Sequence, residues 1–407
     1  MADLWNMPLT EKIETGNIYM GLTIKAKTCV EGNDVPQRIT LRVPGQEISF
    51  LPNFRRGDMV YLYAYKAEDT PDARKSILYR GNIEDIKTDE ITIVLTNGQQ
   101  TREVLKVQPM EGVEHDGQAK LLYAVEHAAS DSTTASAARG LHELITAPDE
   151  RKALLLGQRP PQCDKDISLS KSYHDNYDDI LLKAMQTKDY FLLSGPPGTG
   201  KTSMALRFMV VEELTKPHAS LLLTAYTNRA VDEICAMLDD ARIDYIRMGS
   251  EYSADPRFKH HLMGEMAKTC HRLDNMRRLL ADTKVVVGTT STLMGRPFIF
   301  DIKHFSLAIV DEASQILEPA IIGLLAAHRP TAGGREQTCI DRFVLVGDHK
   351  QLPAVVQQDE ATSAVTSERL RSIHLDNCRN SLFERLLRTE KAAERTAFNG
   401  TLRRQGR

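Results

Sequence analysis

The sequence lacks any Cys-x-x-Cys pair, and its six cysteines are scattered at positions 29, 163, 235, 270, 339 and 378. This scatter argues against a zinc or iron–sulfur framework and favours reduced, structural thiols. No apolar run approaches the roughly 18 residues that a membrane span needs. The first residues also lack the basic and apolar segments of a signal peptide. We therefore expect a cytoplasmic protein with no membrane partner.

An excess of charge of either sign is missing too, since 52 Lys and Arg face 55 Asp and Glu, for a net charge of −3. The chain has no overall positive field, so a nucleic-acid partner would have to be held in a local groove. Hydrophobic residues make up 42% and charged residues 26%, which excludes collagen-like, coiled-coil and wholly disordered classes. The length of 407 residues suggests two or three domains.

The first part of the chain has two different patterns. Residues 15–110 contain short runs in which apolar and polar residues alternate, at 38–43, 59–65 and 91–95. With turn-forming residues between them, these runs favour a small antiparallel barrel. Residues 121–156 have apolar residues at three- and four-residue steps, which predicts helices. We therefore predict a β-rich barrel domain at 1–112 and a helical stalk at 113–165.

From residue 190 onward, apolar runs are continuous and helical stretches separate them. The runs lie at 190–193, 221–224, 285–287, 307–310 and 343–346. Continuous apolar runs are typical of parallel strands that are buried on both faces. The sequence therefore predicts a doubly wound α/β domain over residues 166–407.

Residues 195–202 read Gly-Pro-Pro-Gly-Thr-Gly-Lys-Thr, which fits the phosphate-loop pattern between a predicted strand and a predicted helix. The glycines let backbone N–H groups converge on phosphates at a helix N-terminus. Lys201 would reach the β- and γ-phosphates, and Thr202 would bind Mg²⁺. The predicted nucleotide contacts are Gly195, Pro196, Pro197, Gly198, Thr199, Gly200, Lys201, Thr202 and Ser203.

Two further segments follow apolar runs and carry polar residues suited to phosphate chemistry. Asp311, directly after the run at 307–310, can hold the Mg²⁺ shell, and Glu312 can activate the attacking water. The next run leads to Gly347 and Asp348, from which Gln351 could reach the γ-phosphate or the water. Together with the phosphate loop, the Asp-Glu pair favours hydrolysis of ATP or GTP over simple binding.

The combination of segments resembles the superfamily 1 helicases, in particular the branch of the nonsense-mediated-decay RNA helicase and the DNA replication helicase–nuclease. The matching segments are 195–202 (motif I), 224–232 (Ia), 287–292 (Ic), 311–315 (II), 346–353 (III) and the following 381–385. The resemblance is strong over about residues 175–407. It implies a RecA-like P-loop fold, with a looser match of the barrel and stalk to the branch's accessory domains.

The resemblance also implies roles for single residues. Gln315 and Gln351 would sense the γ-phosphate and couple hydrolysis to movement. The strand-facing residues of motifs Ia and Ic would contact the backbone of single-stranded DNA or RNA; they are Thr224, Asn228, Thr289 and Thr290. Ser381 and Glu384 have the spacing of a helix-capping box.

Two positions depart from the family pattern. Where the family places a glutamine that reads adenine, this sequence has Tyr177, which could stack on the base instead. Motif III ends in Leu352-Pro353-Ala354, although the family has two prolines there.

The end of the sequence resembles the start of motif IV, in which Gln405 and Arg407 flank one residue and Arg407 belongs to the nucleotide site. The later motifs and the second RecA-like lobe are not in these 407 residues. We therefore expect a truncated helicase that needs the second lobe as a partner, because that lobe supplies arginines for phosphoryl transfer. Two alternatives stay open: a P-loop switch without unwinding, and an inactive nucleic-acid-binding remnant.

Overall fold

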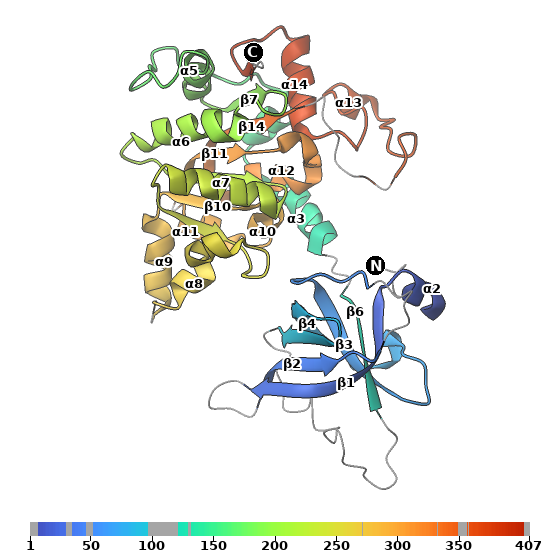
Figure 1. Cartoon of the computed structure of the whole chain (residues 1–407). Coiled ribbons are helices and arrows are strands. Elements are labelled where there is room, and N and C mark those ends of the chain that lie inside the picture. Colours follow the sequence, from blue (N-terminus) through green and yellow to red (C-terminus); the bar gives the residue numbers. More distant parts are fainter. Residues whose placement is uncertain are drawn as a thin grey trace. The chain divides into compact units, whose positions relative to one another are not determined.

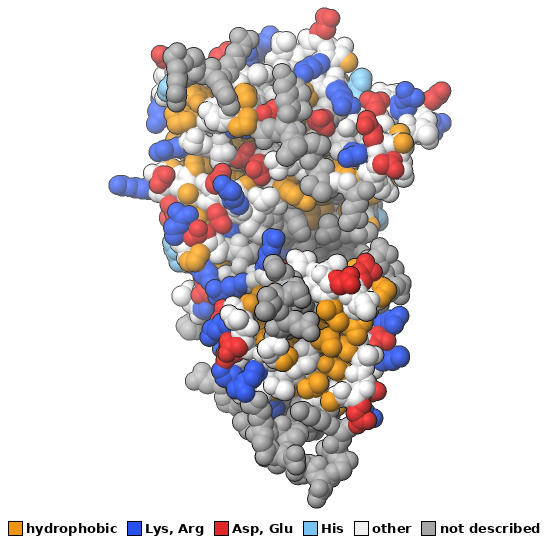
Figure 2. All heavy atoms as spheres, turned by 45° about the vertical axis from the view of Figure 1, so that its right-hand side comes forward, with side chains coloured by type: hydrophobic (Ala, Val, Ile, Leu, Met, Phe, Trp, Pro, Cys, Tyr) orange, Lys and Arg blue, Asp and Glu red, His pale blue; other side chains and the backbone are white. Residues whose placement is uncertain are grey.

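The computed structural model describes residues 7–29, 35–45, 52–96, 121–128, 132–270, 272–331, 333–348, 356 and 358–402. The chain divides into two compact units, residues 1–131 and 132–407 (Figure 1). On the visible face of both units Lys, Arg, Asp and Glu side chains are interspersed, as the balanced composition predicts (Figure 2). In the described part of the chain, no helix is long and apolar enough to cross a membrane.

The first unit is a closed antiparallel barrel with the strand order β1-β2-β5-β4-β3-β6. Its elements are α2 (Leu9–Glu14), β1 (Ile18–Cys29), β2 (Pro36–Arg42), β3 (Met59–Lys66), η1 (Ala73–Lys75), β4 (Tyr79–Ile86), β5 (Glu90–Leu95) and β6 (Leu121–His127). Alternate residues point inward, so Ile39 and Leu41 of β2 and Ile91 and Ile93 of β5 are completely buried. The predicted antiparallel barrel is confirmed.

The helix expected from residue 121 is wrong over its first seven residues, which form strand β6 and close the barrel between β1 and β3. Tyr123, Ala124 and Val125 are buried there. Pairing with strands far away in the sequence overrides the local helical spacing. Helices do follow, as α3 (Ser132–Thr146) and α4 (Asp149–Leu155). The predicted boundary at residue 112 lies outside the described residues.

The second unit contains a seven-stranded parallel sheet with the order β15-β7-β14-β11-β8-β10-β9. Its strands are β7 (Tyr190–Ser194), β8 (Leu221–Ala225), β9 (Tyr245–Met248), β10 (Val285–Thr289), β11 (Phe305–Val310), β14 (Ile340–Gly347) and β15 (Asn399–Thr401). All five continuous apolar runs are strands of this sheet, which confirms the predicted α/β class. The two edge strands β9 and β15 were not predicted.

The remaining elements of this unit lie around the sheet or connect its strands. The helices are α5 (Asp178–Gln186), α6 (Arg207–Leu214), α7 (Asn228–Asp240), α8 (Met263–Ala267), α9 (Leu273–Asp282), α10 (Thr290–Met294), α11 (Phe298–Ile302), α12 (Ile322–Leu325), α13 (Glu368–Arg371) and α14 (Leu382–Ala392). The short turns and the hairpin are η3 (Lys201–Leu206, a π-helix), η4 (Pro256–His261), η5 (Ala313–Gln315), η6 (Glu318–Ala320), β12 (His328–Pro330) and β13 (Glu336–Thr338).

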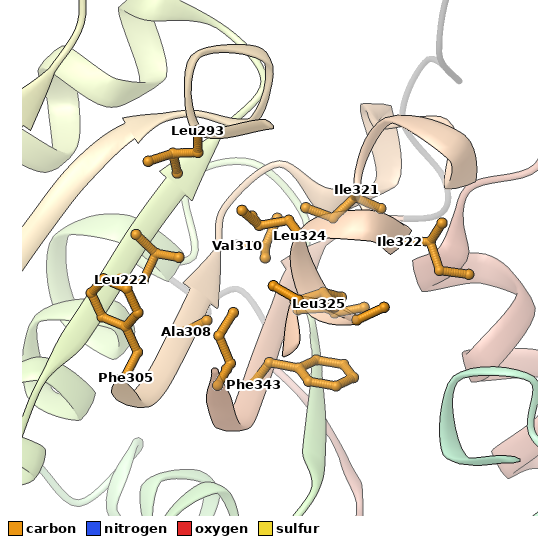
Figure 3. Close-up of a cluster of buried hydrophobic side chains, with 14 of the residues drawn as sticks. Leu222, Leu293, Phe305, Ala308, Val310, Ile321, Ile322, Leu324, Leu325 and Phe343 are labelled. Atoms are coloured by element: carbon orange, nitrogen blue, oxygen red, sulfur yellow. The ribbon is translucent and has the colours of Figure 1, made fainter. Parts of the chain in front are cut away.

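Each face of the sheet has its own hydrophobic core. On one face, Ala308 and Val310 of β11 pack with Leu324 of α12, and Figure 3 shows these side chains converging. On the opposite face, Leu307 and Ile309 of the same strand pack with residues of α6 and α7. Because successive strand residues point to opposite faces, a continuous apolar run supplies both cores.

Helix α14 begins with the predicted capping box. The Ser381 hydroxyl accepts a hydrogen bond from the Glu384 backbone N–H at 3.2 Å, and the Glu384 carboxylate accepts one from the Ser381 N–H at 3.4 Å. The helix then buries Arg385, whose guanidinium donates to both carboxylate oxygens of Glu318, at 2.8 and 2.5 Å, and to the Leu155 carbonyl oxygen. Helix α14 is therefore fixed both at its cap and through a buried ion pair.

Candidate nucleotide-binding site

The carboxyl ends of four neighbouring strands meet at one edge of the sheet. In the register, Ser194 at the end of β7 lies beside Gly347 of β14, and Val310 of β11 lies beside Thr224 of β8. The Gly195 N–H donates to the Gly347 carbonyl oxygen at 3.1 Å. Residues that lie far apart in the sequence are thereby brought together where ligands bind in open α/β sheets.

Residues 195–202 form a loop between β7 and the π-helical turn η3, which begins at Lys201 and continues as α6. Gly198 and Gly200 have φ values of +76° and +73°, a left-handed conformation that side chains disfavour. A Cβ atom on Gly195 would lie 2.9 Å from the Thr199 hydroxyl oxygen. The loop therefore needs its glycines for backbone conformation and close approach, as the phosphate-loop pattern predicts.

Lys201 lies inside this loop. Its ammonium group donates to the carbonyl oxygens of Gly195 and Pro196, the second at 3.2 Å. Burial lowers the pKa of Lys201, while the nearby carboxylates of Asp348, Asp311 and Glu312 oppose that shift. A lysine held in this way can exchange its carbonyl partners for phosphate oxygens.

Thr202 and Asp311 meet across the site. The Thr202 hydroxyl donates to Asp311 Oδ2 at 2.5 Å, and the Glu312 backbone N–H donates to Asp311 Oδ1 at 2.9 Å. Asp311 is only 3% exposed, and burial raises its pKa. A buried carboxylate beside a hydroxyl, with no ion-pair partner among the described residues, is a donor set that suits Mg²⁺. The two residues predicted to bind the metal are thus adjacent.

Glu312 has a φ of +53°, an unusual conformation for a residue other than glycine and one that occurs at functional sites. Its Oε2 atom is buried and has no hydrogen-bond partner among the described residues. Burial raises the pKa of Glu312, and the negative charges of Asp311 and Glu233 raise it further. A carboxylate with a raised pKa is suited to accept a proton from water.

The remaining predicted catalytic and nucleotide residues have different outcomes. Gln315 is half-buried in η5, and its N–H donates to the Glu312 carbonyl oxygen at 2.9 Å. Ser203 is exposed in the first turn of η3. Gln351 and Arg407 lie outside the described residues. Sequence reasoning missed Ser314, whose hydroxyl accepts a hydrogen bond from the Asp348 N–H at 3.1 Å and joins motif II to the end of β14.

Tyr177 immediately precedes helix α5 and also reaches the loop. Its hydroxyl donates to the Thr199 carbonyl oxygen at 2.9 Å. Its ring makes edge-to-face contacts with Phe208, at 5.7 Å between ring centroids, and with His174, at 5.3 Å. The structure therefore places Tyr177 against the loop 195–202 and gives its hydroxyl a protein partner.

The four residues predicted to contact a nucleic-acid strand are mostly buried. Thr224 is completely buried and Thr290 is 2% exposed. Thr289 is the N-cap of α10, and its hydroxyl accepts a hydrogen bond from the Thr292 N–H. Only Asn228, at the start of α7, is exposed. The neighbouring Tyr226 is 52% exposed. It was not among the predicted strand contacts, although it lies inside the motif Ia segment 224–232.

Comparisons with known proteins find similar sequences for this chain. Residues 179–357 match a family model described as an AAA domain. The DNA replication ATP-dependent helicase/nuclease DNA2 of Mus musculus is 29% identical over 408 aligned residues, covering 96% of this chain and 34% of that protein. The human protein of the same name is 37% identical over 190 residues, covering 46% of this chain and 16% of its own length.

A solved structure, the UvsW helicase from bacteriophage T4, matches with a TM-score of 0.30 and 15% identity over 44% of this chain and 56% of that chain. The chain spans about a third or less of the curated relatives described above. In its sequence matches and its motifs, the chain is similar to the superfamily 1 helicases of the DNA2 helicase/nuclease branch.

Proposed function

We propose that these 407 residues form the first motor lobe of an ATP-dependent superfamily 1 helicase, together with an accessory barrel. The observation that carries this proposal is the 2.5 Å contact between Thr202 of the phosphate loop and Asp311 at the end of β11. This contact brings the two halves of a nucleotide-hydrolysing site together at one edge of the sheet. We propose single-stranded DNA as the track, because the relatives carry the names of DNA replication helicase/nucleases.

In this proposal each residue has a defined task. Backbone N–H groups of the loop and the Lys201 ammonium bind the phosphates of ATP, and Thr202 and Asp311 hold Mg²⁺. When bound, the metal would neutralise charge on the β- and γ-phosphates. Glu312 accepts the proton of the attacking water, for which its raised pKa and its unpaired Oε2 atom suit it. Gln315 and Gln351 are proposed to sense the γ-phosphate.

We further propose that efficient turnover needs a second RecA-like lobe. The described residues contain one parallel sheet, and arginines facing the transferring phosphoryl group contribute about 10³–10⁵ in rate in related chemistry. Without a second lobe, we expect nucleotide binding with very slow hydrolysis.

The strand is proposed to contact the beginning of helix α7, where Tyr226, Asn228 and Arg229 are all exposed. An aromatic ring, an amide and a guanidinium can stack on bases and bind phosphates without reading sequence. The predicted contacts through Thr224, Thr289 and Thr290 would then use backbone atoms of these segments, since their side chains are buried.

The test is ATP turnover by the chain, alone and with a second lobe supplied, in the presence and absence of single-stranded DNA or RNA. We expect strand-stimulated turnover once the second lobe is present, and its loss in Lys201→Ala. Lys183→Ala is the control, because it removes only an exposed ion pair with Asp179 on helix α5. Turnover that survives Lys201→Ala, or nucleic-acid affinity without any nucleotide binding, would contradict the proposal.

A further inference from the structure

The segment before helix α5 is held in a defined conformation. The Asp178 carboxylate accepts hydrogen bonds from the backbone N–H groups of Tyr173 and His174, each at 3.0 Å, and from the Ser172 hydroxyl at 2.5 Å. One carboxylate therefore closes the turn that presents Tyr177.

A second carboxylate fastens the same segment to the helix of the phosphate loop. Glu212 of α6, only 5% exposed, accepts from the Ser170 N–H at 2.9 Å, the Ser170 hydroxyl at 2.6 Å and the Tyr173 hydroxyl at 2.8 Å. Because α6 continues the turn that begins at Lys201, the segment and the loop are attached to one rigid element.

Tyr177 then makes direct contact with the loop. The bond from its hydroxyl to the Thr199 carbonyl oxygen is 2.9 Å long, and a Cβ atom on Gly200 would lie only 2.5 Å from that hydroxyl. The edge-to-face contacts with His174 and Phe208, at 79° and 78° between ring planes, fix the direction of the ring.

The bonded carbonyl belongs to the peptide unit that joins Thr199 to Gly200. In a trans peptide the C=O and the following N–H point in opposite directions, and no cis peptide bond occurs in the described residues. By holding the Thr199 carbonyl oxygen, Tyr177 fixes the plane of this peptide, so the Gly200 N–H points away from Tyr177 on the other side of the C–N bond. Converging N–H groups are how such loops bind phosphates.

We infer that Tyr177 is a positioning residue for the phosphate-binding loop and acts on the phosphate part of the ligand, independently of the base. The inference rests on the proposed nucleotide site and deepens it. It replaces the expectation that Tyr177 stacks on adenine, because the hydroxyl is committed to the loop and neighbouring rings occupy its surroundings.

The experiment compares wild type, Tyr177→Phe and Tyr65→Phe in binding Mg²⁺-ATP, Mg²⁺-GTP and Mg²⁺-tripolyphosphate, which has no base. Losing one hydrogen bond that orients the loop is expected to weaken all three ligands alike, by about 2- to 12-fold. Tyr65→Phe is the matched control, because it removes a hydroxyl that bonds the Gly21 N–H inside the barrel unit. Its three affinities should equal those of wild type.

The outcomes are distinct. Weakened binding of ATP with unchanged binding of tripolyphosphate would show that Tyr177 reads the base and would overturn the inference. Unchanged affinity for all three ligands in Tyr177→Phe would overturn it as well. The melting temperature of Tyr177→Phe without ligand should stay close to that of wild type. If the hydroxyl had only a structural role, the variant would melt at a lower temperature and keep its affinity for the three phosphate ligands. If wild type bound none of the ligands, the nucleotide site itself would be refuted.

Discussion

Buried carboxylates serve different purposes in the two units of this protein. In the barrel, Glu126 is 8% exposed and is paired with the equally buried Lys12 at 2.6 Å, and it also accepts a hydrogen bond from the Tyr63 hydroxyl. In the α/β unit, Asp311 is buried and Glu312 is half-buried at the sheet edge with a buried Oε2 atom, and neither has an ion-pair partner among the described residues. A paired buried carboxylate stabilises a fold, whereas unpaired ones at a strand end mark a site that a cationic ligand completes.

The largest effect is expected for Glu312→Gln. Removing the proposed proton acceptor should lower ATP turnover of the chain completed by a second lobe by about 10²–10⁴-fold. ATP affinity should change little, because Lys201, Thr202 and Asp311 remain. In wild type, turnover should rise with pH through the raised pKa of Glu312, since the base must be deprotonated. Steady-state kinetics against pH would check both points, and undiminished turnover in the variant would exclude Glu312 as the base.

Arg385→Met should have the next largest effect, on stability. Breaking a buried ion pair leaves Glu318 without its cation and typically costs about 3–5 kcal/mol in the free energy of unfolding. Arg388→Met is the control on the same helix, because its contact with Asp376 at 3.4 Å is exposed. That variant should lose less than about 1 kcal/mol. Denaturant unfolding would measure the stability of both variants. Equal losses in the free energy of unfolding would contradict the claim that the ion pair matters because it is buried.

Lys12→Met tests the paired carboxylate of the barrel. We expect a loss of about 1–3 kcal/mol in the unfolding free energy of this unit, because Glu126 keeps its burial but loses its cation. Lys25→Met removes an exposed ion pair with Glu90 in the same barrel and should be nearly neutral. An unchanged free energy of unfolding in Lys12→Met would show that the Lys12–Glu126 pair makes no net contribution to stability.

The smallest expected effect is a gain in stability, on substitution of Asp311, where the variants above lose stability or turnover. The raised pKa of Asp311 means that folding favours its protonated form, so its contribution to stability is lost as pH rises through the folded-state pKa. Asp311→Asn should therefore stabilise the ligand-free protein at neutral pH, by about 0.5–2 kcal/mol. Asp240→Asn, at an exposed position, should not. A lower melting temperature in Asp311→Asn would break the contrast between the two kinds of carboxylate.

Much of the α/β unit was readable from the sequence because its signals are local. The five central strands are continuous apolar runs, the phosphate loop is one segment, and the Ser381–Glu384 capping box spans four residues. Strand β6 was missed because its partners β1 and β3 lie far away in the sequence, and its own spacing also suits a helix. Pairing at a distance decided its conformation.

The side-chain surroundings of the site were less accessible to sequence reasoning. Whether a threonine at a strand end faces solvent depends on the covering elements, and Thr224 and Thr290 proved to be buried. The bond between Tyr177 and Thr199 joins residues 22 positions apart and depends on the turn that Asp178 closes. Composition and spacing carry no information about such a contact. The cytoplasmic location and the three-part division of the chain stay predictions.

The measurement that tests the central claim most directly is ATP binding by calorimetry, with and without Mg²⁺, in wild type, Lys201→Ala and Asp311→Asn. Binding requires no second lobe. The account predicts that Mg²⁺ strengthens binding in wild type, that Asp311→Asn loses this strengthening, and that Lys201→Ala loses most of the affinity. Equal affinities in all three proteins, or ATP binding in wild type that does not depend on Mg²⁺, would show that Lys201 and Asp311 do not form a nucleotide site.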